Sequence, residues 1–146
     1  MSPAVVGVGV DHQDVESVRQ AAARFGERYR RRWCTAAELV ALGEHPAADG
    51  LGRLVAAKEA VVKALAPPPD LAVPWTDVEI DAHAGTAQLR GPLAHHARAR
   101  GVASVRVTHS VGGGLALALA LALGGPATER PPSADHRPTD RQGARR

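Results

Sequence analysis

The chain has 146 residues, which suits one ordinary domain, and 45% of them are hydrophobic, which excludes a disordered polymer. Aromatic residues make up only 3%, so Val, Leu and Ala must fill the core and few rings are present to stack on bases. The formal net charge is +3, but the five arginines and three acidic residues within 125–146 account for +2 of it, so residues 1–124 carry only +1 and we expect no nucleic-acid partner.

The C-terminal segment, 125–146, is rich in Pro, Gly, Ser and Arg and has no apolar periodicity. We therefore predict a disordered tail there, after one domain over residues 1–124. The single cysteine, Cys34, excludes an intramolecular disulfide and suits a reducing cytoplasm. The apolar run at 115–123 is far shorter than the ~20 residues of a transmembrane helix, and the N-terminus has no signal-peptide pattern, so we expect no membrane partner.

The first half of the chain predicts one strand followed by helices. The apolar segment 4–10 predicts a strand, and the apolar residues of 15–25, spaced by three and four, predict a helix. The three arginines at 30–32 are expected in a solvated turn. Thr35 and Glu38 then have the spacing of a capping box, which predicts the start of a short helix.

A longer helix is predicted over 47–65, because its apolar residues fall near one stripe and the first proline comes at 67. The elements after it are strands 76–81 and 87–90, helix 92–100, and strands 102–110 and 115–123. The alternation of Leu and Ala in the last strand suits a strand that is covered on both faces. The order β-α-α-α-β-β-α-β-β predicts an α+β fold with a central antiparallel sheet packed by helices.

Two acidic residues are candidates for chemistry. Asp11 ends the first predicted strand, just after Gly7 and Gly9, and the two glycines let a ligand or another backbone approach closely. Asp11 could also cap the next helix, as Asp14 could. Glu59 interrupts an aliphatic stretch of the long helix and shares a face with Lys63. The two form either an exposed ion pair or a site where a bound cation compensates the acid.

His109 lies near the end of the predicted strand 102–110, just before the glycines at 112–114. These glycines could form either a phosphate-binding nest or a flexible hairpin turn. By itself the histidine indicates little, because histidines at such positions are commonly exposed or already hydrogen-bonded. The sequence contains no HExxH, Walker loop or GxSxG motif.

The order of these pieces resembles the holo-acyl-carrier-protein synthase family of 4′-phosphopantetheinyl transferases. The segments that carry the resemblance are GVGVDHQDVESV at 7–18, RRWCTAAEL at 31–39, AAKEAVVKAL at 56–65, WTDVEI at 75–80 and VRVTHS at 105–110. Together they cover essentially all of residues 5–123. The resemblance implies the 4′-phosphopantetheinyl transferase fold.

The resemblance also implies an activity, which is transfer of the 4′-phosphopantetheine arm of coenzyme A to a serine of an acyl carrier protein, as in fatty acid biosynthesis. It implies Asp11 and Glu59 as Mg²⁺ ligands, Lys63 as a catalytic and phosphate-binding residue, and His109 and Arg53 as coenzyme-binding residues. One or two carboxylates are what Mg²⁺ takes from a protein when it binds phosphates, and Glu59 is also expected to act as the base. The family it resembles contains homotrimers with active sites between subunits, so we expect a homotrimer.

Three departures from the family pattern bear on the substrates. Val55 stands where the family has Phe or Trp, the turn at 66–69 contains three prolines in place of a glycine, and Ser17 stands where a basic docking residue is expected. The groups expected to attract an acidic carrier are Arg19, Arg24 and the arginines at 30–32. The alternatives are the same chemistry on a polyketide or peptide-synthase carrier, and a degenerate protein that binds coenzyme A or a carrier without turnover.

Overall fold

The structure is a computed structural model that describes residues 3–44 and 46–125. Its strands are β1 (Val5–Asp14), β2 (Val78–Asp81), β3 (Thr86–Leu89), β4 (Val102–Gly112) and β5 (Leu115–Gly124). Its helices are α1 (Val15–Phe25), α2 (Glu27–Trp33), α3 (Ala36–Leu42), α4 (Ala48–Leu65), the short 3₁₀ helix η1 (Trp75–Asp77) and α5 (Gly91–Ala99). The predicted disordered tail, from residue 126 onward, lies outside the described residues.

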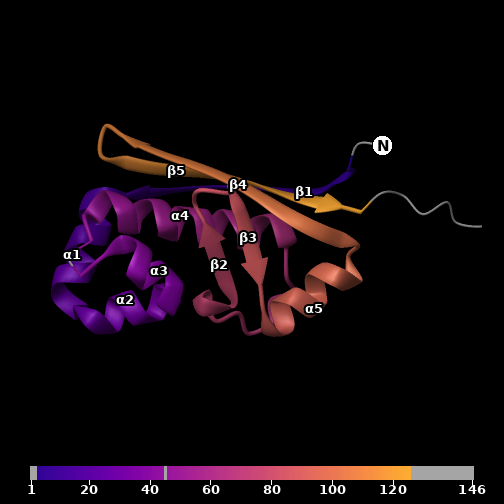
Figure 1. Cartoon of the computed structure of the whole chain (residues 1–146), viewed down its shortest axis with the longest axis horizontal. Coiled ribbons are helices and arrows are strands. Elements are labelled where there is room, and N and C mark those ends of the chain that lie inside the picture. The colour runs from indigo at the N-terminus through magenta and orange to yellow at the C-terminus, as the bar shows by residue number, and fades with distance from the viewer. Residues whose placement is uncertain (1–2, 45, 126–146) are drawn as a thin grey trace, which may run out of the picture.

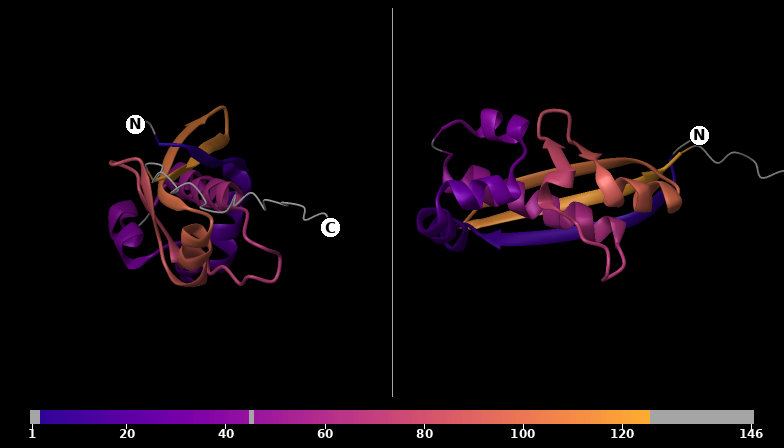
Figure 2. Two further views of the ribbon diagram at one scale, coloured as in Figure 1. Left: turned by 90° about the vertical axis from the view of Figure 1, so that its right-hand side faces the viewer. Right: turned by 90° about the horizontal axis from the view of Figure 1, so that it is seen from below.

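The strands form one antiparallel sheet in the order β1-β5-β4-β3-β2. Figure 1 shows the helices on one side of the long strands β1, β5 and β4, and in the view from below α4 runs along these strands (Figure 2). The core lies between α4 and the sheet, where small side chains of β5 and α4 are almost fully buried. The predicted α+β fold with a central antiparallel sheet packed by helices is confirmed.

The close approach of α4 to β1 depends on glycines in the strand. A Cβ built on Gly9 would lie 2.5 Å from the backbone nitrogen of Ala64 and closer still to the backbone oxygen of Ala60. A Cβ on Gly7 would likewise collide with the backbone oxygen of Ala64. Because backbone atoms inside a helix cannot move aside, only glycine fits at these two positions of β1.

The alternation of Leu and Ala in β5 divides the strand between two environments. Ala116, Ala118 and Ala120 are at most 1% exposed because they pack under α4. Leu117 and Leu119 point to the other face and are 50% and 38% exposed. The prediction of a strand covered on both faces is therefore wrong for the single chain, in which one face is apolar and open to solvent.

A helix, α2, replaces the turn predicted around the arginines at 30–32. Trp33 is buried and stacks on Trp75 with the ring centroids 4.4 Å apart, while Tyr29, one helical turn earlier, packs against the same core. Glu27 pairs with Arg31 at 2.9 Å, which is favourable at i,i+4 in a helix. Burial of two aromatic rings spaced by four residues therefore decides the conformation that the charged run alone does not indicate.

Helix α4 is followed by Ala66, its C-cap, which has φ +42° and is the one non-glycine residue with positive φ among residues 3–44 and 46–125. Because a Cβ is disfavoured in this left-handed conformation, Ala66→Gly is expected to raise the free energy of unfolding by about 0.5–1 kcal/mol. Chemical denaturation measures the change. The matched control is Ala23→Gly, an exposed position inside α1, which should lower stability by about 1 kcal/mol; the same sign for both variants would contradict the prediction.

In the part of the chain that the structure describes, no helix combines the length and the apolar character needed to cross a membrane.

Candidate active site

Asp11 lies inside β1 and not at its end, because the strand continues for three residues to Asp14. Asp14 caps α1 and accepts hydrogen bonds from the backbone nitrogen and the hydroxyl of Ser17, at 2.9 and 2.6 Å. The role of helix cap therefore belongs to Asp14. Asp11 is 8% exposed, and its side chain lies on the inner face of the sheet, where it points toward α4.

A cluster of Asp11, Glu59 and Lys63 forms where β1 meets α4. The ammonium of Lys63 donates to Oδ1 of Asp11 at 2.7 Å and to the backbone oxygen of Val10 at 3.3 Å. The other carboxylate oxygen of Asp11 accepts from the side chain of Gln13 at 2.7 Å. Glu59 lies one turn before Lys63 on the same face of α4, so the structure brings together the three residues that the sequence nominated for the reaction.

The electrostatics of this cluster leave Glu59 short of compensation. Burial raises the pKa of Glu59, and the nearby carboxylate of Asp11 raises it further, against a smaller opposing effect of Lys63. The hydrogen bond to Asp11 raises the pKa of Lys63 and keeps it an ammonium. Lys63 therefore pairs with Asp11 across the two elements, in preference to the Glu59–Lys63 ion pair that the i,i+4 spacing allows.

Asp11 and Glu59 fit a Mg²⁺ site that is shared with a substrate. Among the described residues no group of three or more His, Cys, Asp and Glu side chains is placed to hold a metal on its own. Mg²⁺ is usually bound by one or two protein carboxylates, with water and substrate phosphates filling its other positions. Asp11 and Glu59 match that pattern, because they are close enough for the charge of Asp11 to raise the pKa of Glu59.

The raised pKa of Glu59 has a consequence for stability. A carboxyl group that is harder to ionise in the folded state destabilises the fold at pH values above its folded pKa, and the cost disappears below its ordinary value of 4.5. Glu59→Gln is therefore expected to raise the melting temperature at pH 7, and the difference from wild type should vanish near pH 4. The control is Glu16→Gln, for which the expected change has the opposite sign. Hydrogen bonds to Arg19 and Gln20 lower the pKa of Glu16 to about 2, so this variant should have a lower melting temperature than wild type at pH 7. A lower melting temperature for Glu59→Gln at pH 7 would contradict the prediction.

Arg53 and His109 lie together in a separate pocket of about 190 Å³ between α3, α4 and β4. Burial lowers the pKa of His109, and the positive charge of Arg53 lowers it further, so the imidazole is neutral at pH 7. Nδ1 of His109 is buried and has no hydrogen-bond partner among the described residues. Leu54 also lines this pocket, whereas Val55 is 2% exposed and packs in the core.

The two groups of candidate residues are related through Ala118 of β5. Asp11 is its partner on β1 and His109 is its partner on β4, so the three residues stand in one row across the sheet. Two strand spacings place Asp11 and His109 about 10 Å apart, with α4 over the row. The structure therefore brings Asp11, Glu59 and Lys63 into one cluster and Arg53 and His109 into a second, without merging the two.

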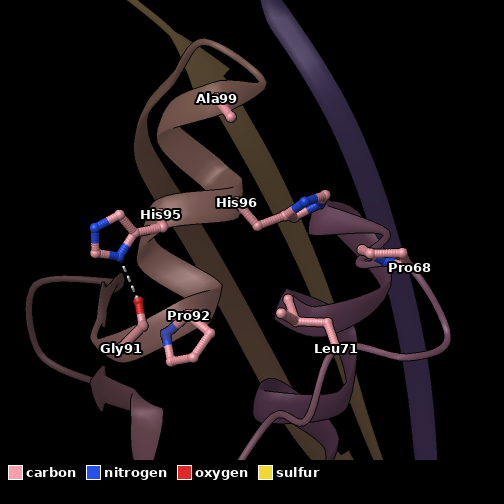
Figure 3. Close-up of a pocket in the computed structure, with 7 residues that line it drawn as sticks. All are labelled: Pro68, Leu71, Gly91, Pro92, His95, His96 and Ala99. Carbon is pink, nitrogen blue, oxygen red and sulfur yellow. Dashed lines mark hydrogen bonds between the residues drawn. The ribbon is translucent and has the colours of Figure 1, made fainter.

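A third hollow, of about 660 Å³, lies beyond the end of α4 and contains none of the five nominated residues. Figure 3 shows Pro68, Leu71 and Pro92 around it, with His95 bonded to the backbone oxygen of Gly91 at 3.3 Å. Its lining is mostly apolar and holds no carboxylate. Its two histidines are each engaged with a backbone oxygen, His95 with that of Gly91 and His96 with that of Leu65 at 2.9 Å.

The structure contains one buried ion pair that the sequence patterns do not predict. Lys58 is 0% exposed and its ammonium lies 2.7 Å from the carboxylate of Glu38, which is 4% exposed. The capping-box spacing located Glu38, and the charge of Lys58 within an aliphatic stretch was visible. Their pairing was not, because they are twenty residues apart on different helices.

Comparisons with known proteins identify the family of this chain. A sequence model of the 4′-phosphopantetheinyl transferase superfamily matches residues 7–120. The chain belongs to this superfamily. It is 35% identical over 123 residues to the holo-[acyl-carrier-protein] synthase of Streptomyces coelicolor, covering 82% of this chain and 98% of that protein. The prediction that the chain is a phosphopantetheinyl transferase is confirmed.

Solved structures of phosphopantetheinyl transferases share the fold. The holo-ACP synthase of Plasmodium yoelii superposes with a TM-score of 0.73 at 20% identity, covering 86% of this chain and 100% of that one. A Chronobacterium ammoniagenes ACPS solved as a complex with CoA is 26% identical, with a TM-score of 0.63, over 79% of this chain and 94% of that one. The similarity extends over nearly the whole length of these family members.

Proposed function

We propose that this enzyme transfers 4′-phosphopantetheine from coenzyme A to a serine of an acyl carrier protein and requires Mg²⁺. The observation that carries the proposal is the cluster in which Asp11 and Glu59 place two carboxylates beside the ammonium of Lys63. Such a set suits the cleavage of a pyrophosphate, because the reaction needs a divalent cation on the phosphate oxygens and a cation near the leaving group. The curated relatives in Streptomyces carry the name of this activity.

The residues divide the work as follows. The serine oxygen of the carrier forms a bond to the phosphorus of phosphopantetheine, and the bond from that phosphorus to adenosine 3′,5′-bisphosphate breaks. Glu59 accepts the serine proton, a role that a carboxylate within this cluster can fill. Lys63, whose side chain is 53% exposed, can turn its ammonium toward the departing phosphate. Asp11 and Glu59 would hold Mg²⁺, which would supply positive charge beside the phosphate oxygens.

Arg53 and His109 are assigned to the coenzyme. The guanidinium supplies positive charge for a phosphate, and the neutral imidazole has one buried nitrogen free to bond a ligand. These two residues lie in a different pocket from the Asp11 cluster. We therefore propose that the enzyme is a homotrimer in which neighbouring copies complete each site. The apolar outer face of β1 and β5 is the surface on which copies would associate.

A charge on that outer face tests the assembly. Leu119→Glu is expected to convert a trimer to a monomer in sedimentation experiments and to abolish loading of the carrier, because a carboxylate replaces apolar contact. The matched control is Val40→Glu on α3, where the side chain is 83% exposed on another surface. A Leu119→Glu variant that sediments as the wild type does would contradict the assembly.

The surface proposed for the carrier lies on α1 and α2. Arg19 and Arg31 are held in ion pairs with Glu16 and Glu27, so they offer less charge than the sequence indicates. Arg24 lies over the ring of Phe25, 5.2 Å from its centroid, and the side chain of Phe25 is half exposed. Arg28 and Arg32 line a hollow beside the same ring. An apolar ring surrounded by arginines suits an acidic carrier helix.

A carrier from a polyketide or peptide synthase is the second candidate. Ser17, at the position where the family has a basic docking residue, donates its hydroxyl to Asp14 and presents no charge. The carrier surface therefore differs from the pattern expected for fatty acid synthesis.

The proposed compartment is a reducing cytoplasm, which suits the single buried thiol of Cys34.

A loading assay on a panel of apo carrier proteins tests the function. We expect mass spectrometry to show the phosphopantetheine mass on a carrier only when both coenzyme A and Mg²⁺ are present. Comparison of fatty acid, polyketide and peptide carriers then identifies the substrate. Tight binding of coenzyme A without transfer to any carrier would instead support a binding protein without turnover.

A further inference from the structure

A fully buried lysine, Lys58, links three elements behind the pocket of Arg53 and His109. Its ammonium lies 2.7 Å from Oε2 of Glu38 on α3 and donates to the backbone oxygen of Trp75 in η1 at 3.0 Å. The side chain starts on α4, one residue before Glu59, and points away from the carboxylate cluster toward the other side of the helix. Because Lys58 is 0% exposed, it cannot contact a substrate.

The carboxylate of Glu38 extends this link to a strand. Its Oε2 accepts from the backbone nitrogen of Thr35 at 2.8 Å, which closes the capping box of α3, and its Oε1 accepts from the backbone nitrogen of Ile80 in β2 at 2.7 Å. One buried carboxylate therefore joins the start of α3 to α4 and β2. Its charge is tolerated there because an ammonium and two backbone N–H groups compensate it.

This network is part of the wall of the coenzyme pocket. Glu38 and Ile80 line the pocket together with Arg53 and His109. Leu42, at the far end of α3, forms another part of the wall, and a Cβ built on Gly50 of α4 would lie 3.1 Å from it. The spacing between α3 and α4 therefore sets the width of the pocket, and it is held at one end by the ion pair.

We propose that Lys58 is a positioning residue whose ion pair with Glu38 holds α3 at the distance from α4 at which the pocket of Arg53 and His109 accepts coenzyme A. The inference rests on the proposed function, which assigns that pocket to the coenzyme. The same network leaves the Asp11 cluster, on another face of α4, untouched. Loss of the pair should therefore weaken coenzyme binding and leave the chemical step intact.

The first test removes both charges together, because Lys58→Met alone would leave a buried carboxylate without its cation. In the Lys58→Met/Glu38→Gln variant the KM for coenzyme A is expected to rise about tenfold, with kcat and the Mg²⁺ requirement nearly unchanged. A network that only stabilises the fold would lower the melting temperature without this division between KM and kcat. An unchanged KM in the folded variant would overturn the proposal.

The second variant, Gly50→Ala, moves α3 without touching the ion pair. The new methyl group crowds Leu42, while alanine is a better helix former than glycine, so the melting temperature should hold or rise. We expect the KM for coenzyme A to increase nonetheless, which separates pocket width from stability. If the double variant does not fold, an unchanged KM in Gly50→Ala overturns the proposal.

The NMR resonances of the His109 ring test the positioning role independently of the proposed function. Both variants are expected to shift the ring resonances of His109, while those of His12, on the outer face of the sheet, stay in place. The measurement needs no turnover, so it applies even if the wild type loads no carrier. An unmoved His109 ring in both variants would contradict the positioning role, whereas failure of the wild type to load any carrier would contradict the function.

Discussion

Replacement of Glu59 by alanine is expected to lower the rate of carrier loading by about 10³-fold or more, since it removes the residue proposed both as the base and as a Mg²⁺ ligand. Asp11→Ala should have a comparable effect, because it removes the second carboxylate and releases Lys63 from its 2.7 Å hydrogen bond. The readout is the phosphopantetheine mass on the carrier, followed over time at saturating Mg²⁺. The two losses arise from one site and should not add.

The control for these variants is Asp70→Ala, which removes an exposed carboxylate in the loop after α4. It should load the carrier at the wild-type rate. Circular dichroism establishes that each variant is folded before its rate is compared. If Asp11→Ala and Glu59→Ala load as fast as Asp70→Ala does, the metal assignment is wrong.

Gly9→Ala is expected to destabilise the fold by about 3 kcal/mol or more, the range seen when a core is overpacked and cannot relax. The added Cβ would lie 2.5 Å from the backbone nitrogen of Ala64 and would collide with the backbone oxygen of Ala60. These atoms belong to the α4 hydrogen-bond ladder, so β1 and α4 must separate. The Asp11 cluster spans the same two elements, and loading should fall with stability.

The matched control is Gly112→Ala at the end of β4, where a Cβ would meet nothing within 4 Å and φ is not positive. Its free energy of unfolding should change by less than about 0.5 kcal/mol, as at other open surface positions. Urea denaturation of both variants makes the comparison. Equal stability of Gly9→Ala and wild type would show that α4 does not lie on β1 as described.

Local patterns were sufficient where the chemistry of an element is contained within it. The capping box of Thr35 and Glu38 is present, with hydrogen bonds of 3.3 and 2.8 Å in the two directions. The long helix begins one residue later than predicted and ends at Leu65, as expected. By contrast, the arginines at 30–32 lie in α2, because burial of Trp33 against Trp75 outweighs the preference of a charged run for solvent.

The site shows the same division. Asp11, Glu59 and Lys63 were identified from the sequence because an acid after a glycine-rich strand and two charges in an aliphatic helix are local features. Which carboxylate Lys63 contacts was not, since its partner Asp11 is fifty-two residues away in the chain. The separation of Arg53 and His109 into their own pocket likewise depends on α3, whose position follows from contacts to α4 and β2.

Composition at the outset indicated one small domain with an aliphatic core, and period and capping residues determined most of its elements. Only the tertiary structure decided that Val55 lies in the core and not in the pocket of Arg53 and His109, and that the leucines of β5 form an open face. The physical reason is that alternation and periodicity define the two faces of an element but not what each face meets. That depends on the packing of α4, which the glycines of β1 bring within backbone contact of the sheet.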